Sequence, residues 1–423
     1  MASVQILLAR TAPAGSVPEL LGLPWQLPLQ EWPAGLFVRI RDLGEARHVV
    51  RFVAPAGILV ACKEMPEELV HTEHRLLSYL AAQAVPAVEP LGTVIERGGA
   101  GDGILLTRYL DFSLPYRALF QGHLSPQMTE RLLDALAELL VRLHLTGFFW
   151  GDCSLSNALF RRDAGALSAY LVDAETGELE KDLTDGQREW DLELATERVA
   201  GGIADLAAER EELGWTTGNE PDPLWAADEL AVRYRRLWAE LTREEIIEAS
   251  ERHRAEDRIR RLNALGFDVR ELLVTTAGPG SKLRLATRVV EPGFHIRELA
   301  ALTGLDVGEN QARRLLNDIA GFRAWLSSAE GREVPLAVAA SRWLAEVYEP
   351  AIDAVPAALR GKLEPAEMFH QMLDHRWYLS EASGRDVGTA EAVRSFITTV
   401  LPSFPDERQV LADDRPGQPN VAE

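Results

Sequence analysis

Apolar residues along the first part of the chain recur in the pattern of a small antiparallel sheet with one helix. Short stretches rich in Val, Ile, Leu and Phe are separated by turn residues, which is typical of strands joined by tight connections. The five segments that we expect to be strands are 36–40, 47–53, 58–63, 88–97 and 103–110. Between the third and fourth, residues 66–83 begin with Pro66 and place apolar side chains at positions 69, 76, 77 and 80, which predicts a helix with one buried face.

The pattern becomes helical after this sheet. Residues 126–147 begin with a proline and carry leucines on one face, which predicts a long amphipathic helix ending near Gly147. The segment 151–157 (GDCSLSN) then has loop composition, and it leads into short strands at 158–160 and 169–174. Helical patterns continue from there to the C-terminal region, except for a predicted strand at 282–290.

These patterns predict an α+β protein of several parts. We expect an extended, proline-rich lead-in at 1–35, a small sheet-rich lobe at 36–110 and a helical lobe at 111–220. The polar, proline-containing stretch 216–223 marks the boundary of a mostly helical C-terminal domain at 221–403. The residues from 404 to 423 carry Pro, Gly and charge without periodicity, and we expect a disordered tail there.

Composition narrows the functional classes. The chain has 423 residues with 47% hydrophobic and 26% charged residues, an ordinary globular mixture. Its formal net charge of −21 disfavours binding to nucleic acid or to anionic lipid. It has two cysteines and no apolar run long enough to span a bilayer, so we expect a cytoplasmic protein without a membrane span.

Three polar residues around the loop at 151–157 form the strongest chemical signal. Asp152 is followed five residues later by Asn157, and Asp173 ends the next hairpin. Phosphoryl transfer needs a carboxylate that orients the hydroxyl nucleophile, together with an amide and a second carboxylate that bind Mg²⁺. Each of the three residues alone is common as a turn former, but the ordered set favours a phosphotransferase site.

A lysine and a glutamate in the sheet-rich lobe test this interpretation independently. Lys63 ends the third predicted strand, and Glu73 falls on the apolar face of the following helix. A carboxylate on a buried face requires a cationic partner, and Lys63 is the nearest candidate. Glu67 and Glu68 in the first turn of the same helix are the alternative partners, although they also favour the helix dipole.

With these residues, the chain resembles the protein-kinase-like superfamily, and specifically bacterial lipopolysaccharide-kinase-like proteins with a C-terminal domain of unknown function. The resemblance covers about residues 36–220 and implies a two-lobed kinase-like fold that uses ATP and Mg²⁺. It implies that Lys63 contacts the phosphates and that Glu73 holds Lys63. It also implies that Asp152 is the catalytic base and that Asn157 and Asp173 bind the metal. Arg108 and Tyr109, within the stretch TRYLD at 107–111, are then expected beside adenine.

The chain departs from the kinase pattern at two places that affect the site. The loop expected to cover the phosphates contains only Gly44, so the flanking Arg41 and Arg47 would have to compensate. The second metal-binding motif reads Asp173-Ala174-Glu175, which makes Glu175 a further candidate metal ligand.

The predicted function is therefore transfer of the γ-phosphoryl group of ATP to a hydroxyl of a protein, sugar or small molecule. The main alternative is a pseudokinase or scaffold that acts through its C-terminal domain, because the glycine-poor loop weakens the case for turnover. A second alternative is DNA binding by a helix-turn-helix at 295–319, which the acidic charge disfavours. Its candidate base-contacting residues are Asn310, Gln311, Arg313 and Arg314.

Cys62 and Cys153 lie next to site residues, and we expect both to be structural rather than redox-active.

Overall fold

The structure is a computed structural model of the chain. It describes residues 4–41, 47–98, 102–119, 126–214, 220–242, 245–248, 271–276, 282–288 and 293–408. The chain divides into two compact units. The first consists of Met1–Arg161, Ala169–Ala231 and Gln409–Glu423, and the second of Arg162–Ser168 and Val232–Arg408.

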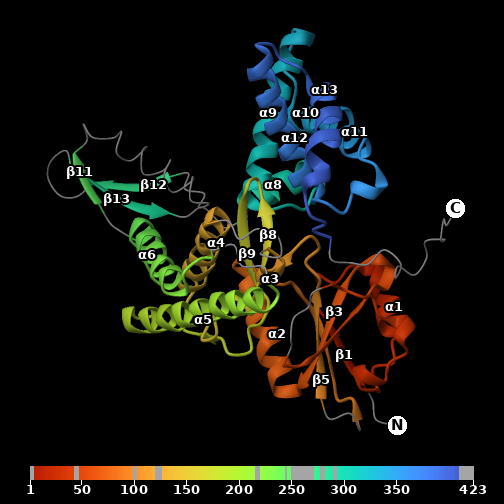
Figure 1. Cartoon of the computed structure of the whole chain (residues 1–423), viewed down its shortest axis with the longest axis vertical. Coiled ribbons are helices and arrows are strands. Elements are labelled where there is room, and N and C mark those ends of the chain that lie inside the picture. The colour runs from red at the N-terminus through yellow and green to blue at the C-terminus, as the bar shows by residue number, and fades with distance from the viewer. Residues whose placement is uncertain are drawn as a thin grey trace. The chain divides into compact units, whose positions relative to one another are not determined.

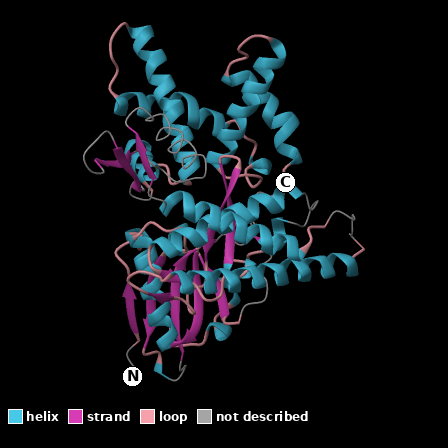
Figure 2. Cartoon of the chain, turned by 90° about the vertical axis from the view of Figure 1, so that its left-hand side faces the viewer, coloured by secondary structure: helices cyan, strands magenta, loops and turns pink. Residues whose placement is uncertain are grey.

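A five-stranded antiparallel sheet forms the N-terminal part of the first unit (Figures 1 and 2). The strands in spatial order are β1 (Gln5–Leu8), β4 (Pro90–Ile95), β5 (Asp102–Arg108), β3 (Val60–Pro66) and β2 (Val49–Val53). Helix α2 (Glu67–Ala82) follows β3 directly and packs against β4 and β5. Every residue of β4 is buried, because α2 covers one face of the sheet and the N-terminal segment packs on the other.

The N-terminal segment is more structured than an extended lead-in. It contains β1 and the short helix α1 (Val17–Leu21), and it buries Leu20, Trp25, Leu29 and Trp32 against the sheet. A buried arginine fixes it in place, since Arg97 donates to the carbonyl of Trp25 and pairs with Glu64. The strand predicted at 36–40 is absent from this region, where a 3-10 turn (Ala34–Leu36) leads to a single bridge at Ile40. The apolar side chains there pack without a continuous hydrogen-bonded partner strand.

The rest of the first unit is mostly helical. The helices that follow the sheet are α3 (Tyr116–Leu119), α4 (Pro126–Leu145), α5 (Asp185–Glu212) and α6 (Pro223–Thr242), the last of which extends beyond the unit's end at Ala231. Two small sheets lie among them, β6 (Leu114–Pro115) with β8 (Ala158–Asp163) and β9 (Ala166–Leu171), and β7 (Phe148–Phe149) with β10 (Glu178–Leu179). The predicted helix starting at Pro126 and the predicted hairpin after residue 157 are both present.

Helices dominate the second unit after a three-stranded sheet. That sheet has the order β11 (Glu245–Glu248), β13 (Lys282–Arg288) and β12 (Glu271–Thr276). The helices are α8 (Phe294–Thr303), α9 (Glu309–Glu330), α10 (Leu336–Trp343), α11 (Glu349–Asp353), α12 (Pro365–Ser383) and α13 (Thr389–Ser395). The strand predicted from residue 282 is β13, whereas β11 and β12 were not expected, because a short apolar run alone does not distinguish a strand from a buried helix segment.

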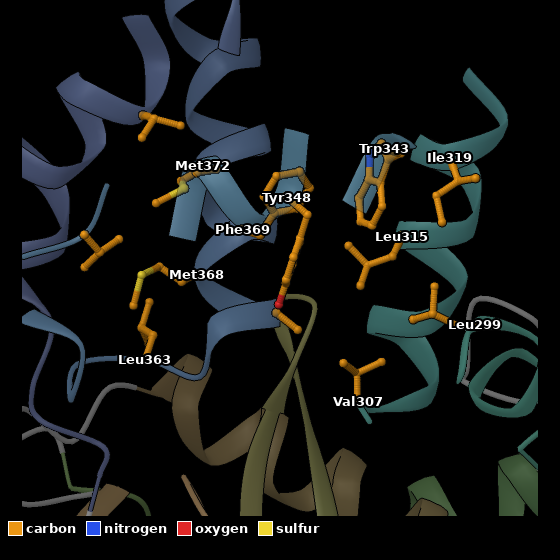
Figure 3. Packing of buried hydrophobic residues seen from close by; sticks show 14 of the residues in the cluster. Leu299, Val307, Leu315, Ile319, Trp343, Tyr348, Leu363, Met368, Phe369 and Met372 are labelled. Carbon is orange, nitrogen blue, oxygen red and sulfur yellow. The ribbon is translucent and has the colours of Figure 1, made fainter. Parts of the chain in front are cut away.

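An aromatic cluster forms the centre of this helical core (Figure 3). Trp343, Tyr348 and Phe369 pack with ring centroids 5.1 to 5.6 Å apart. Such pairs contribute roughly 0.5–1.5 kcal/mol each beyond the area that they bury. The mixed sheet and helix content of the chain confirms the predicted fold class, an antiparallel-sheet region followed by helical regions.

The DNA-binding alternative meets an obstacle in this unit. The predicted helix pair is present as α8 and α9, but Gln311 is buried, with 1% of its surface exposed. The side chain of Asn310 donates to the buried Asp163. Two of the four candidate base-contacting residues are therefore engaged within the fold rather than presented to base edges.

The predicted disordered tail lies mainly outside the described residues, which end at residue 408. Within the described part, Glu407 is 2% exposed and pairs with Arg162. Among the residues that the structure describes, no helix combines the length and the apolar character needed to cross a membrane.

Candidate active site

Lys63 is held on the central part of the sheet and lies among carboxylates. It pairs in register with Val50 of β2 and Leu105 of β5, so its backbone is fixed on both sides. Its ammonium lies 2.9 Å from Glu73 Oε2 and 2.8 Å from Asp173 Oδ2. The expected ion pair with Glu73 is therefore present, and the chain brings Asp173 to the same lysine across 110 positions.

The neighbouring residue Cys62 belongs to the opposite face of β3. Successive side chains of a strand alternate between faces, so Cys62 packs in the buried cluster with Trp25 while Lys63 faces the carboxylates. Burial raises the pKa of the Cys62 thiol to about 12. Burial likewise raises the pKa of Cys153 well above its usual value. Both thiols are therefore protonated near neutral pH, which agrees with structural rather than redox-active roles.

The buried position of Glu73 perturbs the ionisation of the pair. Burial raises the pKa of Glu73 to about 7, although the Lys63 ammonium opposes this. Burial alone would lower the pKa of Lys63, but the carboxylates of Glu73 and Asp173 outweigh it and raise that pKa. Lys63 therefore carries a full charge at neutral pH.

The loop that carries Asp152 is pinned by a buried carboxylate on α5. Asp191 is fully buried and accepts hydrogen bonds from the backbone N–H groups of Trp150, at 2.7 Å, and Gly151, at 2.8 Å. His144 Nε2, at the end of α4, lies 3.0 Å from the same carboxylate. Two bonds therefore fix the backbone immediately before Asp152, and His144 helps to hold the carboxylate that accepts them. The start of α5 is fixed in turn by a capping box between Thr184 and Gln187.

Asn157 and Asp152 contact each other directly within the loop. The Asn157 amide donates to the Asp152 carboxylate at 3.0 Å and to the Asp152 carbonyl at 3.1 Å. Its backbone carbonyl accepts from Val172 N at 3.0 Å, next to Asp173. Asn157 thus binds Asp152 directly and binds the residue before Asp173 through its backbone.

The acidic residues of the cluster have the chemistry of a cation site. Ligand oxygens of Glu73, Asp173 and Glu175 lie within 4.8 Å of one another. The backbone N–H of Glu175 donates to Asp173 Oδ1 at 3.0 Å, which orients that carboxylate. Carboxylate oxygens at this spacing fit the hard oxygen ligands that Mg²⁺ prefers.

Two side chains from the start of the chain, an arginine and a histidine, contact Glu175. Arg47 Nη1 lies 3.0 Å from Glu175 Oε1, and His48 Nε2 lies 2.9 Å from Oε2. Lys63 is 3.7 Å from the same carboxylate. The sequence indicated Arg47 but not His48, because a lone histidine in a strand carries no recognisable pattern.

The remaining residues predicted to bind nucleotide lie elsewhere or are not described. Arg41 is exposed, and Gly44 lies outside the described residues. Arg108 pairs with Glu89 at 2.8 Å. Tyr109 packs edge-on against Phe52 with ring centroids 5.5 Å apart, and its N–H bonds Leu59.

A polar pocket of about 340 Å³ is lined by residues of α3, of the loop at 151–157 and of α5. Its polar lining residues are Tyr116, Ser154, Ser156, Glu197, Arg198 and Asp205. Arg198 Nε on α5 lies 3.5 Å from Asp152 Oδ1. The loop at 151–157 contains no basic residue, so Arg198 supplies a positive charge that the sequence motif did not reveal.

Comparison with known protein families finds similarity in two parts of the chain. Residues 38–244 match the model of a phosphotransferase enzyme family, and residues 236–401 match a domain of unknown function. No curated protein matches the chain significantly. A similar solved structure is described as "WaaP in complex with acyl carrier protein". The similarity covers 54% of this chain and 89% of the other chain, at 15% sequence identity and a TM-score of 0.32. The two family matches together run from residue 38 to residue 401, and each says what its part of the chain is similar to.

Proposed function

We propose that this protein is an ATP- and Mg²⁺-dependent phosphotransferase that moves the γ-phosphoryl group to a hydroxyl acceptor. The observation that carries the proposal is the convergence of Glu73 and Asp173 on the Lys63 ammonium, at 2.9 and 2.8 Å. Nothing in the packing of the sheet requires three buried or half-buried charges to meet there. A site that positions a triphosphate does require them.

Each residue has a role that follows from its contacts. Lys63 would bind the phosphates, and Glu73 holds its ammonium in place. Asp173 and Asn157 would hold the metal, with Glu175 as a further oxygen ligand; when bound, Mg²⁺ neutralises the charge of the phosphates. Asp152 would accept the proton of the acceptor hydroxyl, and the Asn157 amide orients its carboxylate.

The pocket between α3, the loop at 151–157 and α5 would hold the acceptor. Its lining includes Arg198, which lies 3.5 Å from the proposed base, and it is polar, with two serine hydroxyls and three charged groups. Such a lining suits a polar molecule that carries several hydroxyl groups better than an apolar one. Arg198 would stabilise negative charge on the transferring phosphoryl group, as arginine does in other phosphotransferases.

A binding protein without turnover is the second candidate, and one observation favours it. The Glu175 carboxylate already contacts Arg47 and His48 and lies near Lys63. If Arg47 and Lys63 bound the phosphates, Glu175 would compete with the nucleotide for them.

The two candidates differ in a binding and turnover experiment on the full chain. A thermal-shift titration with ATP and Mg²⁺, followed by measurement of phosphate release and transfer, separates them. We expect binding and turnover in the parent, loss of metal-dependent binding in Asp173→Asn, and a fall in turnover of about 10²–10⁴-fold in Asp152→Asn with binding retained. Binding without turnover in the parent favours the scaffold. Unchanged ATP–Mg²⁺ binding by Asp173→Asn in calorimetry contradicts the metal assignment.

A further inference from the structure

The turn of the β8–β9 hairpin is part of the second unit. Residues Arg162–Ser168 belong to that unit, whereas the rest of both strands belongs to the first. β8 begins at Ala158, directly after Asn157, and β9 ends at Leu171, two residues before Asp173. The same short hairpin therefore connects Asn157 and Asp173, the two proposed metal-binding residues, to a turn that belongs to the second unit.

A buried aspartate at this turn caps a helix of the C-terminal domain. Asp163 is 2% exposed, and its carboxylate accepts from the backbone N–H groups of Gln311, at 2.7 Å, and Asn310, at 3.1 Å. The Asn310 side chain and the Ser168 hydroxyl donate to it as well, at 3.2 and 3.1 Å. These N–H groups are the unpaired donors at the start of α9, so a carboxylate 147 positions away in the chain acts as the helix cap.

Other polar contacts surround the turn on both sides of Asp163. Ala164 N donates to the buried Glu367 at 2.8 Å, and the Gln311 side chain donates to the Arg162 carbonyl at 3.1 Å. Arg162 also pairs with Glu407 at 2.5 Å. This is a dense buried network, and breaking any buried, charge-assisted bond of this kind is costly because the partner remains desolvated.

The fit around Asp163 is also tight in space. A Cβ placed on Gly308 would lie 2.5 Å from Asp163 Oδ1, so only glycine allows the carboxylate to approach the start of α9 this closely. Gly308 has an ordinary φ of −69°, so its backbone does not itself require glycine. The absence of a side chain at this position therefore serves the contact with Asp163.

We propose that Asp163 is a positioning residue through which the C-terminal domain sets the affinity of the site for its metal and nucleotide. The inference rests on the proposed function, because it needs Asn157 and Asp173 to bind the metal. Only the hydrogen-bonded β8–β9 hairpin separates this turn from Asn157 and Asp173. A shift of the turn changes the register or the twist of both strands of the hairpin. A partner or ligand that alters α9 would thereby alter nucleotide binding without touching the site.

The test compares three variants of the full chain. Asp163→Asn removes the charge without changing size, and Gly308→Ala displaces the same carboxylate from the side of α9 without altering the hairpin sequence. Asp318→Asn is the matched control, since Asp318 also lies on α9 and accepts a hydrogen bond, at 2.6 Å, but from Trp343. All three weaken the second unit, so loss of stability alone does not distinguish them.

The measurement is the Mg²⁺ concentration at half-saturation of ATP binding, by calorimetry. We expect it to rise about 10-fold in Asp163→Asn and Gly308→Ala, by analogy with residues that orient metal ligands, and to stay at the parent value in Asp318→Asn. Binding of ATP in EDTA should be the same in all proteins. The inference is overturned if the Mg²⁺ concentration at half-saturation changes equally in all three variants, or changes in none of them. Either result leaves the proposed function intact. A parent that binds no ATP with Mg²⁺ refutes the proposed function and this inference with it.

Discussion

The buried carboxylate of Asp191 allows a prediction about the loop that presents Asp152. Asp191→Asn keeps the size of the side chain but replaces one acceptor oxygen with an NH₂ group. In the parent, Oδ1 accepts from Gly151 N at 2.8 Å, and Oδ2 accepts from Trp150 N at 2.7 Å and lies 3.0 Å from His144 Nε2. Whichever way the new amide faces, at least one backbone N–H then meets a donor instead of an acceptor.

The cost can be estimated from these contacts. A hydrogen bond to a charged group contributes about 1.5–3 kcal/mol, and a buried donor left without an acceptor costs about 1–3 kcal/mol. Removing a buried charge recovers part of that loss, so we expect a net destabilisation of about 3 kcal/mol. Because the lost bonds hold the residues directly before Asp152, we also expect turnover to fall at least about 10²-fold, the effect of a misplacement near 1 Å.

Urea unfolding and phosphate-release kinetics test both parts of this prediction. Asp185→Asn is a matched control on the same helix, because the Asp185 side chain is 94% exposed. We expect the control to change stability by less than about 0.5 kcal/mol and to leave turnover unchanged. Equal stability and equal turnover in the two variants would refute the role assigned to Asp191.

Three further predictions concern charge, pH and the pocket. Lys63→Met should abolish ATP binding and, in urea unfolding at pH 8, destabilise the fold by about 3 kcal/mol, because it leaves a buried carboxylate unpaired. The loss of stability should be smaller at pH 6, where Glu73, with a pKa of about 7, is protonated. An equal loss of stability at both pH values contradicts this. Burial lowers the pKa of His144 below 6.5, against the opposing effect of Asp191. The stability that neutral His144 contributes is therefore complete above pH 6.5 and is lost as the pH falls through the lower folded pKa. We expect acidification below pH 6.5 to lower the melting temperature of His144→Gln less than that of the parent, and parallel curves would count against this. Gly201 lines the pocket proposed for the acceptor, and a Cβ at this position would meet no atom within 4 Å. Gly201→Leu should therefore fill the pocket, preserve ATP hydrolysis and prevent phosphoryl transfer to the acceptor. Retained transfer would place the acceptor elsewhere.

The sequence predicted those parts of the site that leave a local mark. Glu73 could be found because a carboxylate on the apolar face of a helix requires a partner, and Lys63 at the end of the preceding strand was the candidate. The same reasoning applied to α5 would have found Asp191, which lies on a buried stripe with Leu192 and Ala195.

Other features depend on contacts that no local pattern encodes. His48 and Arg198 gain meaning only from Glu175 and Asp152, more than 40 positions away in each case. The Asp163 turn has the composition of an ordinary hairpin turn, and its partner helix lies 147 positions further along the chain. Long-range packing decides such contacts, so the sequence alone indicated the elements but not how they meet.

A crystal structure of the full chain with a non-hydrolysable ATP analogue and Mg²⁺ would decide whether this cluster is a nucleotide site. We expect phosphate oxygens within hydrogen-bonding distance of Lys63 Nζ, and a metal ion bound by Asp173 and Asn157. We also expect Glu175 to move away from Arg47 and His48, or to join the metal. Nucleotide bound elsewhere, with Lys63 still paired only to Glu73 and Asp173 as in the free protein, would contradict these expectations.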